Sequence, residues 1–533
     1  MRLDRIEVRN FRCFSDFTLD IAGESLLLVA PNAGGKTALL TAVRLALNGG
    51  TVSRGDFRDL GAPVELIATV SDIPPTAHGV FADAMDFGTT PPTLRIAVRG
   101  AWDPVELEVE SHYGFPDDGW RRAGREAREN LPVLWLPAWR DAGKLTPFVG
   151  RQSILEELVR GLTLDDHVDQ AVTAMTTASD HLARAEPLQQ LVSELRDELA
   201  AVLPRVDPGA YSLGLDVAEP HDVLRQFELL LAHRGPEVPV VGHSDGLRQA
   251  SIFALTLRLL TVKPGALLLV DEPEISLHPH GQRALVAALR GRARQSILAT
   301  HTATALDRVD PRTVTRLRRD AGGDTESVRA SGMTDVDARR LSRYATSQTA
   351  EAYFAETVIL VEGFSDLLAV RAVSPGLGVN LDGAGVSLLS LDGGDLFMHY
   401  LHLLGPEGLD LDLRGLCDAD KEASWTAKLN GAGVCVVDRA SLNAAGVQVC
   451  APDLEGELLA ALSDAEINQA LNCDGALGDF QTWAAQQPQA TLTVGGQHER
   501  FVKRDKIRWA PLLAAAIDPA NVPTPLINLL ANL

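Results

Sequence analysis

The chain has 533 residues, of which 46% are hydrophobic and 23% are charged, and its formal net charge at pH 7 is −22. This length predicts two or three domains, and the composition is that of an ordinary soluble globular protein. The negative net charge argues against a protein surface that binds nucleic acid without specificity, but it is compatible with a local basic groove.

Five scattered cysteines indicate a reducing environment. They stand at positions 13, 417, 435, 450 and 473 without any Cys-x-x-Cys pair, so neither a zinc ribbon nor a disulfide framework is expected. The first residues lack the apolar core of a signal peptide, and no apolar run reaches the length of a membrane span. We therefore expect a cytoplasmic protein without membrane contact.

A glycine-containing turn joins a predicted strand to a predicted helix near the N-terminus. Residues 26–29 are apolar, residues 30–37 read A-P-N-A-G-G-K-T, and the apolar spacing of residues 38–47 is helical. Strand, glycine loop, Lys-Thr and helix together are the context of a phosphate-binding loop. The alternative is a turn between strand and helix that ends in Gly-Lys-Thr by chance. Ala30 stands where the pattern has glycine, a departure that bears on the rate of ATP turnover more than on nucleotide binding, and the rate stays open.

The loop residues have separate expected roles. Backbone N–H groups around Asn32, Gly34 and Gly35 would hold phosphate oxygens at the positive end of the helix. Lys36 would reach the terminal phosphates, and the Thr37 hydroxyl would hold Mg²⁺. The loop therefore predicts a site for ATP and Mg²⁺.

A second anion-binding signal lies further along the chain. Ser244 and Gly246 belong to the sequence S-D-G-L-R-Q, which opens a predicted helix over residues 250–260. The N-terminus of a helix can bind an anion through its free N–H groups. A capped helix without a ligand explains the same pattern equally well, so the motif supports a nucleotide site only together with other motifs of such a site.

Two predicted buried strands end in polar residues. Residues 266–270 are apolar and lead to Asp271 and Glu272, the first suited to Mg²⁺ and the second to orienting a water. Residues 296–301 read S-I-L-A-T-H, which predicts a second buried strand with a polar residue and His301 at its tip. A strand that merely ends in two acids is the alternative, but the second strand favours a nucleotide site with His301 as a γ-phosphate sensor.

The order of these motifs resembles the ATP-binding-cassette (ABC) class of ATPases, particularly its RecF-like branch that works on DNA. The resemblance covers roughly residues 1–320 and implies that nucleotide binds between two protomers of a homodimer or higher homo-oligomer. It implies that Lys36 and Thr37 act from one subunit, and that Ser244 and Gly246 complete the site from the other. It also implies a hydrolytic carboxylate, a Mg²⁺ ligand and a switch, which are Glu272, Asp271 and His301.

The regions around these motifs differ in pattern. Residues from about 63 to 138 hold short β-like runs separated by Pro and Gly, which predicts a β-rich flank. From about 150 to 205 the pattern is helical and amphipathic without aromatic residues. This stretch is too short for a long coiled coil, so we interpret it as a helical insertion used for packing or dimerisation.

A second α/β unit follows a connector. Residues 321–337 are richer in Gly, Ser, Thr and acids and are interpreted as the connector. The apolar run 357–361 predicts a buried strand, and a helix is expected over 367–373. We therefore expect an N-terminal domain over residues 1–345 and a C-terminal domain over residues 346–533, the last part of which is helical.

Acidic residues follow the predicted strands of the C-terminal domain. Glu362 comes directly after the first strand, and Asp366 lies four residues further on. A later strand ends in Asp418-Ala-Asp420, where an extended backbone places both carboxylates on one side. These four carboxylates predict an oxygen-rich site for Mg²⁺ or Mn²⁺, with Ca²⁺ as a further candidate.

A third acidic cluster and a lysine complete the expected site. Asp453, Glu455 and Glu457 follow the predicted strand 447–450, and which of them binds metal stays open. Two metal ions about 3.5–4 Å apart can activate water and stabilise the leaving oxygen of a phosphodiester. Lys506 would neutralise the charge that develops on the scissile phosphate. The alternative is that each carboxylate is only a solvated surface group.

Glu-Gly-x-x-Asp followed by Asp-x-Asp resembles the Toprim fold of topoisomerases, primases and small nucleases. An N-terminal cassette ATPase fused to a C-terminal Toprim domain resembles the OLD (overcoming lysogenization defect) nuclease family, which includes the ATPase-nuclease subunit of Gabija anti-phage systems. Lys506 stands where that family has a functional lysine before an Ala-x-x-Leu-Ala helix. The resemblance covers nearly the whole chain and implies an α/β fold: an ABC-type P-loop ATPase with a helical insertion, followed by a Toprim α/β domain.

The favoured function is a metal-dependent DNA endonuclease or nickase, gated by the ATPase dimer, in anti-phage defence or DNA repair. A helicase-like partner protein is compatible with the resemblance. The alternative is a RecF-like repair or regulatory ATPase whose Toprim domain binds DNA without cutting it. A topoisomerase needs a tyrosine nucleophile, for which no tyrosine here has a recognisable context, and primases usually bring a zinc module. A transporter ATPase is disfavoured because no membrane segment is visible.

Overall fold

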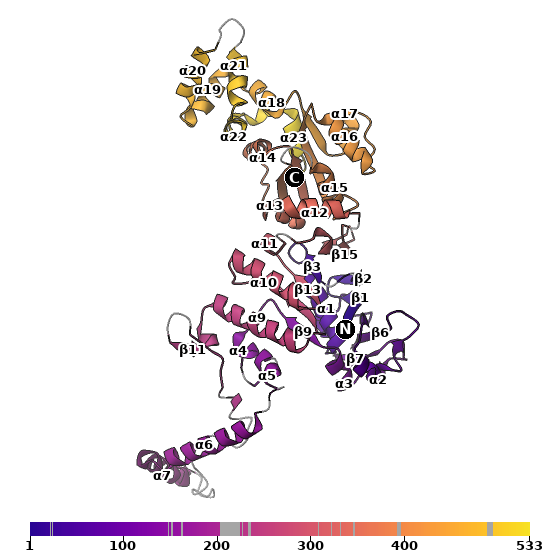
Figure 1. The fold of residues 1–533 in the computed structure, drawn as a ribbon, viewed down its shortest axis with the longest axis vertical. Coiled ribbons are helices and arrows are strands. Elements are labelled where there is room, and N and C mark those ends of the chain that lie inside the picture. Colours follow the sequence, from indigo (N-terminus) through magenta and orange to yellow (C-terminus); the bar gives the residue numbers. More distant parts are fainter. Residues whose placement is uncertain are drawn as a thin grey trace. The chain divides into compact units, whose positions relative to one another are not determined.

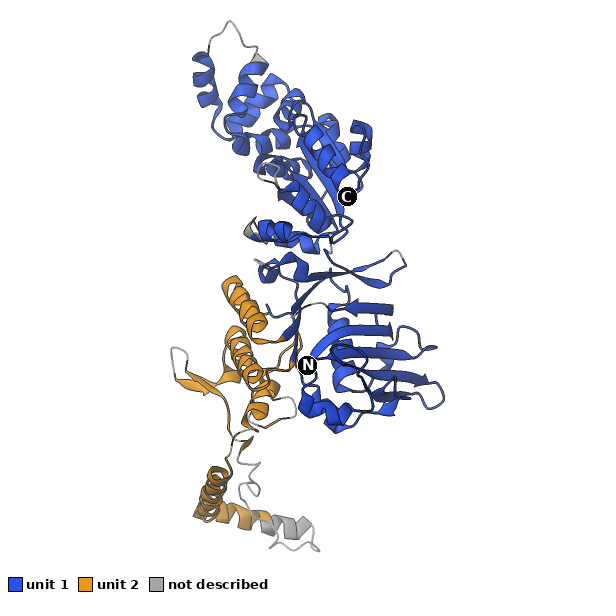
Figure 2. Cartoon of the chain, turned by 45° about the vertical axis from the view of Figure 1, so that its right-hand side comes forward, with its two compact units in different colours: residues 1–133, 267–274, 295–533 blue, residues 134–266, 275–294 orange. Residues whose placement is uncertain are grey.

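The computed structural model describes residues 1–533 except 22, 24, 148, 151–152, 161, 163, 203–223, 226, 233–235, 307–308, 321, 331, 345–346, 392–395 and 488–493. The chain divides into two compact units (Figure 2). The first unit holds residues 1–133, 267–274 and 295–533, and the second holds residues 134–266 and 275–294. The domain boundary expected at 345/346 lies outside the described residues. In the described part, no helix is both long and apolar enough to cross a bilayer.

An antiparallel sheet forms the N-terminal part of the first unit and confirms the expected β-rich flank. Its strand order is β2-β1-β4-β6-β7-β8, with β5 paired to β6. The inward-facing side chains of β1 alternate with exposed ones, as expected when one face of a sheet is buried. The strands are β1 (Arg2–Phe11), β2 (Phe14–Asp20), β4 (Val64–Ser71), β5 (Met85–Asp86), β6 (Thr93–Asp103), β7 (Glu108–Phe115) and β8 (Arg121–Arg122).

A mostly parallel sheet in the same unit carries the glycine loop. Its strands in the first unit run in the order β15-β14-β3-β13-β12, and β13 pairs in parallel with both β3 and β12. All residues of β12 and β13 are buried, which explains the apolar runs Leu267–Val270 and Ile297–Ala299 within them. The strands are β3 (Ser25–Val29), β12 (Leu267–Asp271), β13 (Gln295–Ala299), β14 (Val314–Arg319) and β15 (Thr325–Val328).

Helix α1 (Lys36–Asn48) lies between these two sheets (Figure 1). It contacts β4 and β6 of the antiparallel sheet and β12 and β13 of the parallel sheet. Its alanines, leucines and valine are buried, so the predicted helix over residues 38–47 is confirmed. The shorter helices of this part are η1 (Arg54–Asp56), η2 (Pro75–Ala77), α2 (His78–Phe81), α3 (Arg125–Asn130), α11 (Ala303–Leu306) and η5 (Pro311–Thr313).

The connector expected over residues 321–337 was wrong in part. β15 lies within it and pairs antiparallel with β14, and α12 (Asp335–Tyr344) begins before its end. The sequence of β15 is T-E-S-V, and three of its four side chains are half-buried. An edge strand of this kind needs no apolar run, so its sequence does not differ from that of a polar loop.

The second unit is largely helical. The predicted helical insertion is confirmed over α5, α6 and α7, whereas residues 203–205 lie outside the described part. Helices α9 and α10 contact each other within this unit. Its elements are β9 (Val133–Leu136), α4 (Ala142–Leu145), α5 (Ile154–Val159), α6 (Asp165–Ala183), α7 (Glu186–Val202), β10 (Leu230–Ala232), β11 (Glu237–Pro239), η4 (Val240–Gly242), α9 (Asp245–Val262) and α10 (Pro279–Arg292). The first residue of β9, Val133, still belongs to the first unit.

A four-stranded parallel sheet forms the centre of the C-terminal domain. Its order is β17-β16-β18-β19, and β16 is buried along its whole length. A Cβ on Gly415 of β18 would lie 2.7 Å from the ring of Trp425, so glycine is needed where this ring covers the strand. The strands are β16 (Thr357–Val361), β17 (Val386–Ser390), β18 (Asp412–Asp418) and β19 (Val447–Cys450).

The C-terminal helices share one hydrophobic core with this sheet. Helices α14 and α22 contact each other along their lengths, and Trp509 and Leu513 of α22 are buried in the same core as Ile359 of β16. This packing fixes the start of α22, and therefore Lys506, beside the sheet. The helices are α13 (Ser347–Glu351), η6 (Ala352–Phe354), α14 (Phe364–Val373), α15 (Phe397–Leu404), α16 (Glu422–Gly431), α17 (Arg439–Ala444), α18 (Leu454–Ala460), α19 (Asp464–Cys473), α20 (Leu477–Ala485), α21 (Val494–Val502), α22 (Lys506–Ala516), η7 (Pro519–Asn521) and α23 (Thr524–Leu530).

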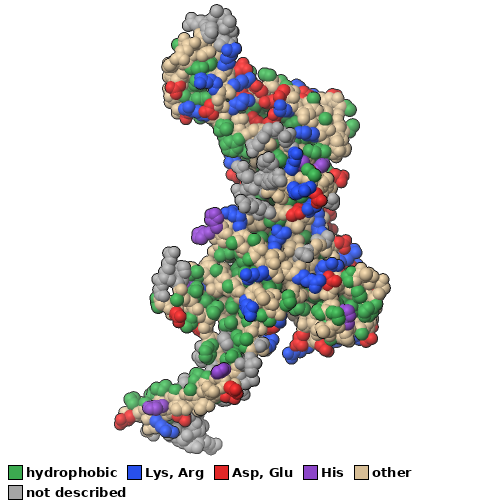
Figure 3. Space-filling model, in the orientation of Figure 1, with side chains coloured by type: hydrophobic (Ala, Val, Ile, Leu, Met, Phe, Trp, Pro, Cys, Tyr) green, Lys and Arg blue, Asp and Glu red, His purple; other side chains and the backbone are tan. Residues whose placement is uncertain are grey.

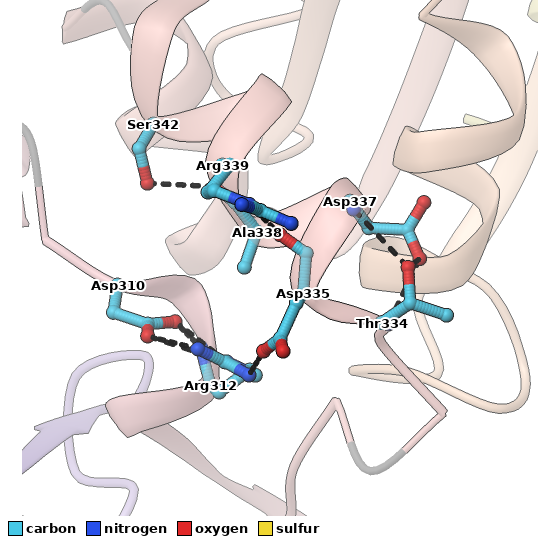
Figure 4. A network of polar contacts seen from close by, with 8 residues as sticks. All are labelled: Asp310, Arg312, Thr334, Asp335, Asp337, Ala338, Arg339 and Ser342. Atoms are coloured by element: carbon cyan, nitrogen blue, oxygen red, sulfur yellow. Dashed lines mark hydrogen bonds and ion pairs between the residues drawn. The ribbon is translucent and has the colours of Figure 1, made fainter.

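A polar network holds the start of α12 (Figure 4). On its exposed side, Arg312 pairs with Asp310 and with Asp335. On its buried side, Asp337 accepts hydrogen bonds from the backbone and hydroxyl of Thr334. The same carboxylate faces the Nδ1 atoms of two histidines of α15, His399 and His402.

The hydrogen bonds of Asp337 decide its charge. Burial acts to raise its pKa, but the bonds from His399, Thr334 and His402 outweigh burial and hold the pKa well below its ordinary value. Asp337 is therefore ionised at neutral pH and satisfies donors from two helices. Its stabilising contribution is present above the unfolded-state pKa of about 4 and is lost as the pH falls further.

We expect Asp337→Ala to lower the free energy of unfolding by about 1–3 kcal/mol, because it leaves buried donors without an acceptor. The matched variant on the same helix is Asp335→Ala, which removes only an exposed ion pair and is expected to change little. Thermal unfolding of both variants at neutral pH checks this. Equal shifts of the midpoint would contradict the role given to Asp337.

Candidate functional site

The glycine loop lies between β3 and α1, and its backbone explains the alanine at position 30. A Cβ on Gly34 would lie 2.6 Å from the Cβ of Ala30, which is closer than side chains approach. Ala30 itself is fully buried. The loop therefore accommodates this alanine because residue 34 has no side chain. Gly35 has a φ of 96°, which favours glycine there as well.

Lys36 is held inside the loop. Its side chain is buried, and Nζ donates to the carbonyl oxygen of Ala30 at 2.8 Å. The Nδ1 atom of His301 lies 3.4 Å from the same Nζ. Burial lowers the pKa of Lys36 to about 8, although the charges of Asp271 and Glu272 act in the opposite direction.

The ends of β12 and β13 bring three further predicted residues to the loop. Thr37 Oγ1 donates to Asp271 Oδ2 at 2.7 Å, and Asp271 is buried. The backbone N–H of Glu272 donates to Ala299 O at 2.8 Å, which continues the pairing of the two strands. The side chain of Glu272 lies 3.5 Å from His301 Nε2. The structure therefore places Lys36, Thr37, Asp271, Glu272 and His301 together.

Sequence reasoning missed one carboxylate of this group. Glu274 accepts hydrogen bonds from Thr300 Oγ1 at 3.0 Å and from the backbone N–H of His301 at 2.6 Å. Burial raises the pKa of Glu274 above its ordinary value. The signal was present as a third acid, two residues after Glu272, but only the folded strand ends show that it orients the histidine.

The other predicted nucleotide contacts are Asn32, Ser244 and Gly246. Asn32 is exposed in the loop. Ser244 directly precedes α9, and its side chain does not cap that helix. A Cβ on Gly246 would lie 3.1 Å from the carbonyl oxygen of Ser276, so glycine fits closely there. Ser244 and Gly246 belong to the second compact unit.

Three of the predicted carboxylates meet at the carboxyl ends of β16 and β18. Glu362, Asp418 and Asp420 each offer one oxygen, and these atoms lie within 4.8 Å of one another. The pairing of Val361 with Leu416 brings the two strand ends side by side. Glu362 Oε1 accepts the backbone N–H of Asp418 at 2.7 Å. The arrangement is the one that the two strand-end motifs predict.

The cluster has the chemistry of a cation site. Burial and the charges of Glu362 and Asp366 raise the pKa of Asp418 to about 7. Burial also raises the pKa of Glu362. Carboxylates that repel one another in a partly buried place are stabilised by a divalent cation, and oxygen ligands suit Mg²⁺ and Mn²⁺. The residues present therefore fit such an ion.

Asp366 lies beside this group in a different role. Its Oδ2 accepts the backbone N–H of Gly363 at 2.9 Å and so caps the start of α14. Burial and the charge of Glu455 raise its pKa, and the positive charge of Lys506 opposes them. Within the described residues it is outside the group of three whose oxygens lie within 4.8 Å.

The third acidic cluster separates into three environments. Glu455 is fully buried, and its Oε2 accepts from Lys506 Nζ at 2.7 Å, whereas its Oε1 has no hydrogen-bond partner among the described residues. Asp453 caps α18 and pairs with Lys503 at 2.6 Å. Glu457 accepts the backbone N–H of residue 451 at 3.1 Å.

Lys503 stands in the basic run around Lys506, and the sequence predicted no separate role for it. It lies three residues before Lys506 and pairs with both Asp453 and Glu499. Figure 3 shows basic and acidic side chains next to one another over α18, α21 and α22. The sequence could not show that Lys503 pairs with Asp453, because the two residues are 50 positions apart along the chain.

Comparisons with protein families match both parts of the chain. Residues 28–307, just over half of the chain, match the family described as "AAA domain, putative AbiEii toxin, Type IV TA system". Residues 353–420 match "Overcoming lysogenization defect protein-like, TOPRIM domain". The two matches contain the glycine loop and the carboxylates Glu362, Asp418 and Asp420, respectively.

Two curated relatives cover most of the chain. An OLD nuclease of Thermus scotoductus is 26% identical over 421 residues, which are 73% of this chain and 77% of the relative. The Old nuclease of Escherichia phage P2 is 21% identical over 462 residues, which are 78% of this chain and 77% of the relative.

Solved structures are similar to single parts of the chain. The C-terminal region of the Burkholderia pseudomallei OLD protein is 24% identical and covers 33% of this chain and 96% of its own, with a TM-score of 0.27. The SMC head domain from Thermotoga maritima is 12% identical and covers 62% of this chain and 98% of its own, with a TM-score of 0.30.

We expect Gly34→Ala to weaken nucleotide binding about tenfold to hundredfold, since overpacking of a fitted site costs about 1–3 kcal/mol. The new Cβ would meet Ala30 and push the loop out of shape. Gly55→Ala is the matched control, because a Cβ there meets nothing within 4 Å. Titration with a fluorescent ATP analogue measures both; equal affinities would refute the close fit of the loop.

The raised pKa of Asp418 predicts a pH dependence of metal binding. Below about pH 7 a proton competes with the metal ion for this carboxylate, so the affinity for Mn²⁺ should fall about tenfold for each pH unit. Above that pH the affinity should level off. Calorimetric titration between roughly pH 5 and pH 8 measures the slope, and a flat profile would contradict the assignment.

Proposed function

Since this chain belongs to the AAA-domain family and carries an OLD-like TOPRIM domain, we propose that it is a divalent-metal-dependent DNA endonuclease or nickase regulated by ATP. The observation that carries the proposal is the group Glu362, Asp418 and Asp420 at the ends of two parallel strands. The relatives named OLD nucleases support the nuclease activity. Phosphodiester hydrolysis is the chemistry that such a group of carboxylates favours.

The residues around the carboxylates have distinct proposed roles. Glu362, Asp418 and Asp420 hold Mg²⁺ or Mn²⁺, which supplies Lewis acidity toward a phosphodiester. Lys506 presents its ammonium group beside them, where it can neutralise charge on a phosphate oxygen. Asp366 positions the start of α14, directly after Glu362.

Glu455 is the member of the third cluster that we assign to a second cation. Its buried Oε1 lacks a hydrogen-bond partner among the described residues, which is costly unless a cation satisfies it. Leu454 at the start of α18 donates its backbone N–H to Asp418 Oδ1 at 3.0 Å. Glu455 is the next residue of the chain, so its backbone lies close to the carboxylates Glu362, Asp418 and Asp420. Asp453 and Glu457 are engaged in other bonds.

The N-terminal domain is proposed to bind ATP and Mg²⁺. Lys36 leaves the carbonyl of Ala30 and binds the terminal phosphates, while Thr37 and Asp271 hold the ion. Glu272 orients the water and His301 senses the γ-phosphate. The loop contributes its backbone through Asn32, Gly34 and Gly35, and Ala30 is proposed to make turnover slow.

The assembly and setting belong to the same proposal. Ser244 and Gly246 complete the nucleotide site from a second protomer, so that an ATPase homodimer gates cutting by the C-terminal domain. The domains are proposed to span residues 1–345 and 346–533. The protein would act on DNA in the cytoplasm, in anti-phage defence or DNA repair, with a helicase-like protein as a further partner.

The test is cleavage of supercoiled plasmid with Mg²⁺ or Mn²⁺. We expect Glu362→Gln to lower the cutting rate by at least about 100-fold, because the ion loses a ligand at the site of reaction. Glu407→Gln is the matched control, since it neutralises an exposed acid of the same domain. Lys36→Ala, assayed in parallel, shows whether nucleotide activates or inhibits cutting.

Each outcome separates the proposed nuclease from the alternative. Intact plasmid with the wild-type protein under both metals would refute cutting, and DNA binding without cutting would favour a RecF-like regulatory ATPase. Equal rates for wild type and Glu362→Gln would place the chemistry outside this group of carboxylates.

A further inference from the structure

Three arginines at the end of β14 lie between the glycine loop and the C-terminal sheet. β14 pairs in parallel with β3, and Arg316 is paired with Val29, the last residue of β3 before the glycine loop. Arg316 is buried, Arg318 is half-buried and Arg319 is exposed. All of them belong to the first compact unit, as do both sites.

One side of the β14–β15 hairpin contacts the glycine loop. Arg319 Nη2 donates to the carbonyl oxygen of Ala33 at 3.5 Å. Thr325, the first residue of β15, has its methyl group 3.6 Å from the place of a Cβ on Gly35. The hairpin therefore contacts the loop at Ala33 and approaches it at Gly35, and both of these residues have left-handed backbone angles.

The other side of the hairpin holds the starts of β16 and β18. Arg316 Nη2 donates to the carbonyl oxygen of Ala355 at 3.0 Å, two residues before β16. Arg318 Nη1 binds the backbone oxygen of Asp410 at 2.9 Å and its carboxylate at 2.7 Å, two residues before β18. Thr357 Oγ1 donates to Asp412 Oδ2 at 3.1 Å and joins the two strand starts.

These two strands end at the candidate metal centre. β16 leads to Glu362 and β18 to Asp418, and the strands are paired along their length. β16 is buried along its whole length, β18 is buried from Gly415 to Cys417, and each strand has a neighbour on both sides, so a displacement at the strand start is passed along the strand axis. A shift of about 1 Å in a reacting group can change a rate about 100-fold.

The contact region is polar and therefore able to rearrange. A cavity of about 440 Å³ lies there, lined by arginine, aspartate and glutamate side chains. Arg318 binds two acidic residues at once, Glu326 of β15 through Nε and Asp410 through Nη1. The buried Nε of Arg316 makes no hydrogen bond among the described residues. Polar contacts between domains generally permit relative motion more readily than apolar ones.

We propose that β14 couples the nucleotide site to the metal centre, with Arg316 and Arg318 as positioning residues. Phosphate binding draws the loop backbone and Lys36 toward the nucleotide. The β14–β15 hairpin moves with the loop through Arg319 and Thr325. Arg316 and Arg318 then pass this displacement to the starts of β16 and β18. The spacing of Glu362 and Asp418 then differs between the nucleotide-free and nucleotide-bound states. This inference rests on the proposed nucleotide binding, but not on DNA cutting.

The test is hydrogen–deuterium exchange of the full chain with and without a non-hydrolysable ATP analogue. In the wild type we expect nucleotide to change exchange about fivefold in peptides covering residues 352–361 and 409–418, the low end of typical coupling between sites. Arg318→Gln should abolish this difference while nucleotide still binds. Arg318→Lys should keep part of it, because lysine retains the charge but not the forked geometry.

The control is Arg125→Gln, which removes an exposed ion pair on α3. It should behave as the wild type, and Lys36→Ala should show no response. A purely structural role of Arg318 would raise exchange equally with and without nucleotide and leave the difference intact, which would overturn the proposal. So would a wild type that binds the analogue without any change in these peptides, or that fails to bind it.

The same variants separate this inference from the proposed nuclease activity. If plasmid is cut, the ratio of rates with and without the analogue should approach one in Arg318→Gln, while the nucleotide-free rate stays close to that of wild type. If plasmid is never cut, the nuclease proposal fails, and the exchange measurement still decides the coupling.

Discussion

The parallel pairing of β16 with β18 is the constraint on which the C-terminal domain depends. It fixes Glu362 against the backbone of Asp418, so two carboxylates that repel each other are held together by the sheet. Burial, together with the charges of neighbouring carboxylates, raises the pKa of both groups. Buried aliphatic side chains along β16 and the ring of Trp425 over Gly415 stabilise the sheet that holds these carboxylates.

Features that depend on local sequence could be predicted. Apolar runs in the sequence identified β3, β12, β13 and β16, and Glu362 at the end of β16 lies close to Asp418 and Asp420, as the strand-end motifs predicted. β15 could not be found, because an edge strand has no apolar run. Glu274 and Lys503 were missed because their roles come from partners on other elements. Such contacts exist only after folding.

The comparisons confirm the two-part organisation that the motifs indicated, an AAA-type ATPase domain followed by an OLD-like TOPRIM domain. The structure adds how this chain departs from the general loop pattern. Alanine at position 30 is accommodated because glycine stands at position 34, so the two positions have to be considered as a pair. A substitution at either one therefore changes what the other tolerates.

The bond between Lys36 and the carbonyl of Ala30 has a consequence for how tightly the loop can bind. A lysine whose charge is already satisfied gains only the difference between its old partner and its new one. The protein's own backbone thus acts as a competitor of the phosphate, and it keeps the loop in shape when no ligand is present. The exchange of partners reduces the free energy gained on binding. The ordering of the lysine side chain that binding normally requires has already taken place during folding.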